Sequence, residues 1–177
     1  AIQFHNENDL RIQNCSAWHQ SSGKKTTYIS DFAGQVFCMN SPVSIEGKVR
    51  IVPTDRSKFL NKEVQRRYPP CERGEKKIDT EDIQNNERYD IYTNDEMGAR
   101  CFLTPGRLRK FTEHFSDREI SVYLKGSKLY FAVNSGYSLF HVPWNRMDFW
   151  QMNYDKEWER FRFSLEYIQE ICKGFEE

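Results

Sequence analysis

The clearest pattern of apolar and polar positions lies between residues 119 and 133. Two alternating segments flank Gly126-Ser127, a dipeptide suited to a two-residue hairpin loop. Such a loop fixes the strand register, so the sequence predicts an antiparallel hairpin. The predicted core-facing pairs are Leu124 with Leu129, Val122 with Phe131 and Ile120 with Val133, while Tyr123 lies opposite Tyr130 on the other face.

Further strands are predicted upstream of this hairpin. Residues 1–25 indicate one or two short edge strands, and β-forming residues dominate from Thr26 to Asn40, where Gly34 is a predicted bulge. Lys48 to Ile51 alternate polar and apolar side chains until Pro53 ends the segment. A Glu46-Gly47 turn precedes that strand and predicts a hairpin with the segment that holds Val43 and Ile45.

Helical spacing predicts three helices. Phe59, Leu60 and Val64 lie among basic residues and predict a short amphipathic helix over 57–67. A second helix is predicted over 105–115, with Thr104 as its N-cap and Pro105 as its first residue. The last is predicted over 155–174 by an apolar stripe with helical steps: Trp158, Phe161, Leu165, Ile168, Cys172 and Phe175.

Together these elements predict an α+β fold: a largely antiparallel, twisted sheet with about three helices, the long C-terminal one packed on one sheet face. A length of 177 residues suits one soluble domain over residues 1–177. The chain begins at Ala1 without an initiator Met. That start is compatible with removal of the Met and also with a domain cut from a longer protein.

Charge changes this picture only locally. Basic and acidic residues both number 26, so no net field draws the chain to nucleic acid or anionic lipid. Basic residues nevertheless dominate 58–77, and acidic ones dominate 79–96. We favour solvated segments, while the alternative is a nucleic-acid or anionic-lipid surface formed by five side chains: Lys62, Arg66, Arg67, Lys76 and Lys77.

Signatures of familiar enzymes are missing from the sequence. The five cysteines include no Cys-x-x-Cys pair, and their odd number cannot close entirely into intramolecular disulfides, which favours a reducing compartment. Cys38 and Cys101 lie among apolar residues, as packing thiols do. No Gly-x-Ser-x-Gly, His-Glu-x-x-His or glycine-rich phosphate loop is present. We therefore predict no catalytic residue, no metal ligand and no cofactor.

One concentrated group of carboxylates follows a predicted strand at 89–92, in which Tyr89 and Ile91 alternate with Asp90 and Tyr92 as in a half-buried strand. Carboxylates at a strand end can perform acid–base chemistry or bind cations, although acidic turns are more often solvated. The candidate surface of an enzyme or ligand-binding site therefore comprises Asp90, Asp95, Glu96 and Arg100.

Aromatic residues make up 15% of the chain and crowd the run from Trp144 to Tyr154. Such side chains could stack on bases or sugars, or anchor a partner protein. We favour the alternative that Trp144, Phe149 and Trp150 fill the space between the sheet and the last helix, because a protein of this size needs large side chains in its interior.

Three motifs together resemble a bacterial family known as domain of unknown function 3137. They are the segment Phe32–Phe37, the stretch Tyr89–Pro105 with its acidic turn, Ala99-Arg100 and Leu103-Thr-Pro, and the hairpin Val122–Val133 followed by Leu139-Phe140. The resemblance covers about residues 30–140. It implies no catalytic residues, but members often place hydrophobic, membrane-spanning segments before a domain like this one.

These observations favour a non-enzymatic, membrane-associated accessory or protein-interaction domain with protein partners at a membrane. The resemblance implies a location on the cytoplasmic side of the bacterial inner membrane if membrane segments precede this domain. Otherwise, we expect a cytoplasmic protein.

Overall fold

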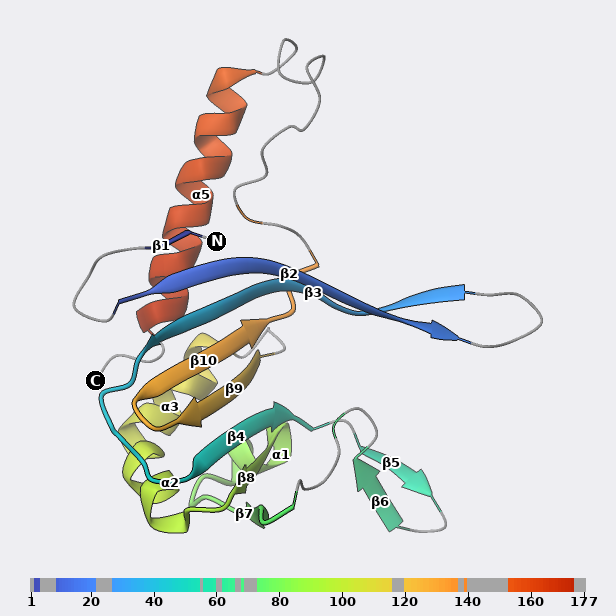
Figure 1. Ribbon diagram of the computed structural model, residues 1–177, viewed down its shortest axis with the longest axis vertical. Coiled ribbons are helices and arrows are strands. Elements are labelled where there is room, and N and C mark those ends of the chain that lie inside the picture. The colour runs from blue at the N-terminus through green and yellow to red at the C-terminus, as the bar shows by residue number, and fades with distance from the viewer. Residues whose placement is uncertain are drawn as a thin grey trace.

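The computed structural model describes residues 2–3, 9–21, 27–54, 56–59, 62–65, 68, 73–115, 120–136, 139 and 153–173. Eight strands form one antiparallel sheet in the order β1-β2-β3-β10-β9-β4-β8-β7 (Figure 1). Their bounds are β1 (Ile2–Gln3), β2 (Arg11–Ser21), β3 (Thr27–Asn40), β4 (Lys48–Pro53), β7 (Lys76–Ile78), β8 (Tyr89–Thr93), β9 (Ile120–Lys125) and β10 (Lys128–Val133).

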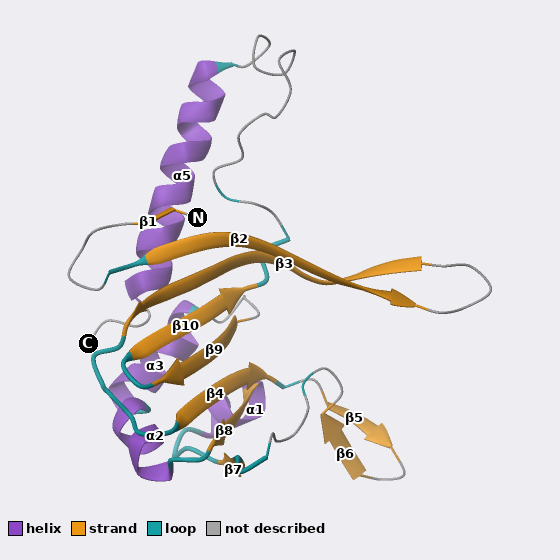
Figure 2. Cartoon of the chain, viewed as in Figure 1, coloured by secondary structure: helices purple, strands orange, loops and turns teal. Residues whose placement is uncertain are grey.

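The described helices are α1 (Ile83–Arg88), α2 (Glu96–Phe102), α3 (Pro105–His114) and α5 (Tyr154–Lys173). In the view of Figure 2 the helices lie on the far side of the sheet, beyond whose edge α5 extends, so the face toward the reader carries no described helix. We call that surface the open face. The predicted α+β fold, with a long C-terminal helix on one sheet face, is confirmed.

The hydrophobic core fills the space between the sheet and the helices. Phe37 of β3 stacks on Phe131 of β10, with ring centroids 4.6 Å apart. On the helix side, Phe111 makes edge contacts with Tyr89 of β8 and with Phe115. Because these rings are almost fully buried, the middle of the sheet and α3 form one packed unit.

The hairpin formed by β9 and β10 has the predicted register. Leu124 lies opposite Leu129, and Val122 lies opposite Phe131. Gly126 adopts a φ of 59°, a conformation that glycine reaches without strain, so the two-residue loop closes as expected.

The helix after Thr104 is also confirmed. The Thr104 hydroxyl accepts a hydrogen bond from the Arg107 amide, and Pro105 opens α3. The preceding strand differs from the prediction, because all five residues of β8 are buried. We expected β8 to be half-buried.

The predicted helix over 57–67 is wrong. Residues Arg56–Phe59 form β5 and Lys62–Gln65 form β6, and these strands pair as an antiparallel hairpin with Phe59 opposite Lys62. Three apolar residues are too few to distinguish helical from strand periodicity.

Two details of the strand predictions are corrected as well. Gly34 is no bulge: the irregularity falls at Asp31, because Ala17 pairs with Phe32 whereas Trp18 pairs with Ser30. Gly34 instead allows close packing, since a Cβ there would overlap the Val133 carbonyl oxygen. The predicted hairpin before β4 is also absent from the described residues, in which β4 pairs with β8 and β9 rather than with Val43 and Ile45.

The C-terminal helix is packed along only part of its length. Ser164, Tyr167 and Ile168 are buried, whereas Trp158 and Phe161 of the predicted apolar stripe are 66% and 43% exposed. We name residues 154–163 the outer half of α5; it extends beyond the sheet in Figure 1. The predicted helix is therefore confirmed, but its first two stripe residues do not pack in the core.

Strands β2 and β3 also extend beyond the other strands, as an arm on the right of Figure 1. Residues 18–20 of β2 pair with residues 28–30 of β3 along it. Trp18 and Tyr28 are more than three-fifths exposed on this arm. Among the described helices, none combines the length and the hydropathy needed to cross a bilayer.

Truncation of α5 side chains should distinguish its two halves. Ile168→Ala removes a side chain that is only 4% exposed and should lower the free energy of unfolding by about 3 kcal/mol. Phe161→Ala, on the outer half, should lower it by less than about 1 kcal/mol. Urea unfolding of both variants measures the difference, and equal losses would contradict the half-packed helix.

Candidate functional site

The structure assigns each predicted carboxylate to a different setting. Asp90 lies in β8, buried to 2% exposure, with a carboxylate oxygen 2.9 Å from Lys77 Nζ of β7. The Tyr92 hydroxyl lies 3.5 Å from its other oxygen. Asp90 is thus an ion-pair partner beneath the open face.

Asp95 is the N-cap of α2. Its carboxylate accepts hydrogen bonds from the backbone amides of Gly98, Gly47 and Glu46. These hydrogen bonds lower the pKa of Asp95 below its ordinary value of 3.8, and the Gly98 amide contributes most, followed by the Gly47 amide. Desolvation raises the pKa and so opposes this shift, while the Glu46 amide lowers it slightly further. The ionised carboxylate therefore fastens the start of α2 to the loop before β4.

Glu96 and Arg100 form an exposed ion pair one turn apart on α2, with 2.9 Å between the charged groups. Arg100 also lines a hollow of about 380 Å³ beside the segment 78–82. The four predicted site residues therefore have separate roles: a buried ion pair, a helix cap and a surface pair.

The basic side chains predicted to form a nucleic-acid or anionic-lipid surface are also separated in the structure. Lys62 lies in β6, Lys76 and Lys77 lie in β7, and Arg66 and Arg67 fall outside the described residues, as does most of the run from Trp144 to Tyr154. Because Lys77 pairs with Asp90, its charge is partly neutralised. Lys62 therefore belongs to a different sheet from Lys76 and Lys77.

A carboxylate that the sequence analysis missed lies beneath the open face. The Glu75 side chain is completely buried, with one oxygen 3.0 Å from Lys48 Nζ and the other 2.9 Å from an Arg50 terminal nitrogen. The Arg50 guanidinium in turn lies over the Tyr92 ring, 4.9 Å from its centroid. Two cations of β4 are therefore held in place by one buried anion.

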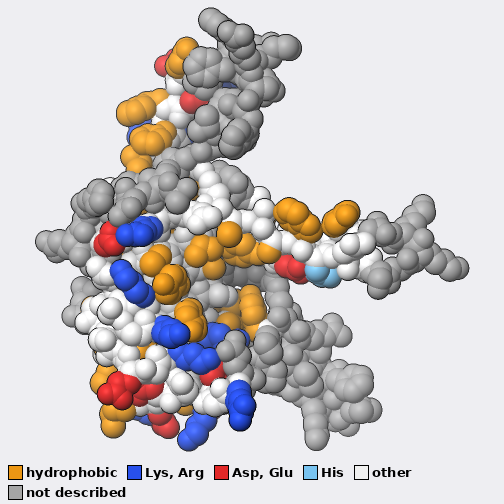
Figure 3. All heavy atoms as spheres, viewed as in Figure 1, with side chains coloured by type: hydrophobic (Ala, Val, Ile, Leu, Met, Phe, Trp, Pro, Cys, Tyr) orange, Lys and Arg blue, Asp and Glu red, His pale blue; other side chains and the backbone are white. Residues whose placement is uncertain are grey.

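Strand register extends this group into a row across the open face. Arg50 lies opposite Tyr92 on one side and Tyr123 on the other, and Tyr123 lies opposite Tyr130. The row crosses seven strands through Arg11, Cys38, Tyr130, Tyr123, Arg50, Tyr92 and Lys77. Figure 3 shows Lys and Arg side chains gathered over the middle of this face.

Part of this row could have been found from the sequence. The Gly126-Ser127 loop places Tyr123 opposite Tyr130 and also aligns Lys125 with Lys128. The alternation of Lys48 and Arg50 with apolar residues likewise puts both cations on one face of β4. What no local pattern indicates is that β4 lies beside β9, which brings these groups together.

The described part of the chain contains no cluster of three His, Cys, Asp or Glu side chains arranged to hold a metal ion. Cys15 and Cys101 are exposed free thiols, and Cys38 is half-buried beside Tyr130. Cys101 is exposed on α2, so its interpretation as a packing thiol is wrong.

Comparisons with known proteins identify the family of this chain. The family model described as a protein of unknown function (DUF3137) matches residues 30–175. A search of curated proteins gave no match. Among solved structures, the crystal structure of the mycobacterial trehalose monomycolate transport factor A, TtfA, aligns with a TM-score of 0.38 and 14% identity, covering 90% of this chain and 72% of that one.

Replacing Gly98 should test how tightly Asp95 is held. Alanine normally stabilises a helix by about 1 kcal/mol relative to glycine. At Gly98, however, the new Cβ would overlap the Asp95 carboxylate and lie 2.9 Å from Ile45 Cγ2, so Gly98→Ala should destabilise by about 1–3 kcal/mol. Gly106 of α3 has open space and is the matched control. Stabilisation by both substitutions, measured by thermal unfolding, would refute the close packing.

Removing the Glu75 charge should be costly. Glu75→Gln keeps the side-chain size but leaves Lys48 and Arg50 without their carboxylate, so we expect a loss of about 3 kcal/mol in the free energy of unfolding. The control, Glu96→Gln, breaks the exposed pair with Arg100 and should change stability little. Chemical denaturation measures both; a Glu75→Gln variant as stable as the control would contradict the role of Glu75.

Proposed function

Because this chain belongs to the DUF3137 family, whose description names no activity, we propose a function from its own surface: a non-enzymatic accessory domain that binds a protein partner at a membrane. The observation that carries this proposal is the outer half of α5, which is a helical surface that extends beyond the sheet and exposes large aromatic side chains.

Four aromatic residues of this segment are exposed. Trp158 and Phe161 stack with centroids 5.9 Å apart while remaining 66% and 43% exposed, and Tyr154 and Phe163 are exposed to more than half of their area. Tryptophan and tyrosine are enriched among residues that dominate binding energy at protein interfaces. Large side chains exposed together on one helix support a role in recognition.

The charges on this segment favour a protein over a lipid surface. Lys156, Arg160 and Arg162 are matched there by acidic residues at 155, 157 and 159, and Arg160 pairs with Glu157 at 2.8 Å. Helices that bind anionic membranes usually carry an excess of positive charge on their polar face. A balanced pattern suits the mixed-charge rim of a protein interface better.

The arm of β2 and β3 offers a second recognition surface. Trp18, Tyr28 and Ile29 are exposed on it, at 63%, 67% and 44% of their area. A partner that contacted the arm as well as α5 would engage two elements that project from the same domain. The membrane location is proposed from the family resemblance, with this domain on the cytoplasmic side.

Site-specific photocrosslinking tests the proposal in cells that express the native gene product with a C-terminal tag. A photoreactive residue at position 158 should give a protein adduct of defined mass that remains in the membrane pellet after a high-salt wash. The control is position 97 on α2, where Met97 is 75% exposed. We expect no such adduct there.

A variant with Trp158→Ala and Phe161→Ala should lose about tenfold or more of the adduct formed from a photoreactive residue at position 163, since hot-spot truncations cost 2 kcal/mol or more each. Its melting temperature should stay close to that of the wild type. Identical adducts from positions 158 and 97, or adducts found only in the soluble fraction, would reject the proposal.

A further inference from the structure

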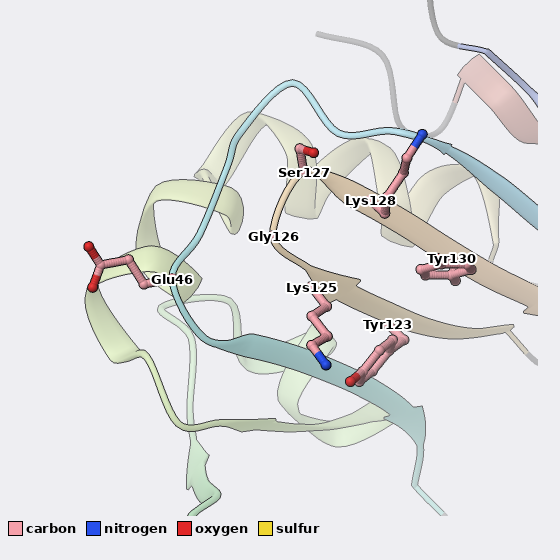
Figure 4. Close-up of a pocket in the computed structure, with 7 residues that line it drawn as sticks. All are labelled: Glu46, Tyr123, Lys125, Gly126, Ser127, Lys128 and Tyr130. Atoms are coloured by element: carbon pink, nitrogen blue, oxygen red, sulfur yellow. The ribbon is translucent and has the colours of Figure 1, made fainter.

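An open hollow of about 700 Å³ lies on the open face, over the hairpin of β9 and β10. Its lining includes Lys125 and Lys128, on either side of the hairpin loop, and Tyr123 and Tyr130, on neighbouring strands (Figure 4). We call these four residues the lysine–tyrosine hollow. It lies on the sheet and not on the outer half of α5, so it is separate from the surface of the proposed function.

Three lysines occupy opposed register positions on adjacent strands at this hollow. Lys125 lies opposite Lys128 of β10 on one side and opposite Lys48 of β4 on the other. Like charges directly opposite each other in a sheet are destabilising. The arrangement therefore concentrates positive charge at a cost to the fold.

The carboxylates nearby do not cancel this charge equally. Glu75 pairs with Lys48, although it shares its single negative charge with Arg50. Lys128 Nζ donates to the uncharged Asn40 amide oxygen at 2.7 Å and lies 3.9 Å from the Asp9 carboxylate. Lys125 is exposed and has no ion-pair partner in the described part of the chain. Positive charge is consequently left at Lys125, with a partly compensated neighbour at Lys128.

The remaining acidic group of the lining is Glu46. In Figure 4 its carboxylate points away from both lysines, toward the outside of the loop. The space above the hairpin is thus available to an anion that comes from outside the chain.

Two phenol groups complete the hollow. The Tyr123 and Tyr130 rings lie with centroids 6.3 Å apart, and Tyr130 is 39% exposed. The electrostatic influence of the neighbouring Cys38 side chain, followed by partial desolvation and a hydrogen bond to Cys38, raises the pKa of Tyr130, so its hydroxyl stays protonated and directs its proton toward Cys38. The rings also offer an apolar surface beside the ammonium groups.

We propose that the lysine–tyrosine hollow binds an organic phosphate, whose phosphate oxygens accept hydrogen bonds from Lys125 and Lys128 and whose attached group lies against Tyr123 and Tyr130. A phosphate ester carries several acceptor oxygens and suits two ammonium groups on paired strands. The same chemistry is offered by a soluble phosphate ester and by a phospholipid headgroup, so the test must distinguish these sources.

Calorimetric titration of the full chain with phenyl phosphate provides the first measurement. The wild type should bind it more tightly than it binds phenol or inorganic phosphate alone, because both parts of the ligand make contacts. Lys125→Gln should weaken binding about tenfold, since a hydrogen bond to a charged group contributes that much or more, and adding Lys128→Gln should abolish it. Tyr123→Phe should weaken it less.

Lys156→Gln is the matched control, because it removes the same charge from an exposed position on α5. It should leave phenyl phosphate binding unchanged. Thermal unfolding should show that Lys125→Gln folds at least as stably as the wild type, since it relieves repulsion in the lysine row.

Vesicles of phosphatidylcholine with and without phosphatidic acid provide the second arm. Sedimentation with phosphatidic acid vesicles that is lost in the double lysine variant would support the proposal and assign a lipid headgroup as the source. Binding of phenyl phosphate without sedimentation would support a soluble ester. The proposal is overturned if neither probe binds, if the double variant binds like the wild type, or if Lys156→Gln weakens binding equally.

Discussion

The open face of the sheet depends on one set of ion pairs, in which the buried Glu75 carboxylate contacts both Lys48 and Arg50. Strand β4 puts two cations on one face, and desolvating them without a counter-charge would cost several kcal/mol. With Glu75 in place, Arg50 can lie over the Tyr92 ring. The same carboxylate pairs with Lys48 and Arg50 but with neither Lys125 nor Lys128, so the negative charge beneath this face lies on the β4 side of the hairpin.

Features set by short-range chemistry could be predicted from the sequence. The two-residue loop at Gly126 dictated the register of β9 and β10, Thr104 and Pro105 marked the start of α3, and apolar spacing revealed α5. The capping role of Asp95 was also readable in principle, because an aspartate three residues before Gly98 can accept its amide hydrogen. In the sequence analysis we instead grouped Asp95 with other carboxylates as a candidate ligand site. Its hydrogen bonds to three backbone amides explain its position without any ligand.

Features set by long-range pairing could not be predicted in this way. The position of β4 between β8 and β9 joins segments that are far apart in the chain, and it alone brings Lys48 beside Lys125. The hairpin of β5 and β6 was missed for a different reason. Its local apolar pattern fitted a helix as well as a strand.

The half-packed helix has an energetic consequence for whatever binds it. From Ser164 onward, α5 is stabilised by burial, but residues 154–163 gain no comparable packing from the sheet. A helical segment of this length is marginal on its own in water and persists here because the packed turns nucleate it. Its amides should therefore exchange with solvent through local fraying rather than global unfolding. A ligand that ordered this end would spend part of its binding free energy on suppressing that fraying, which would favour rapid, reversible association.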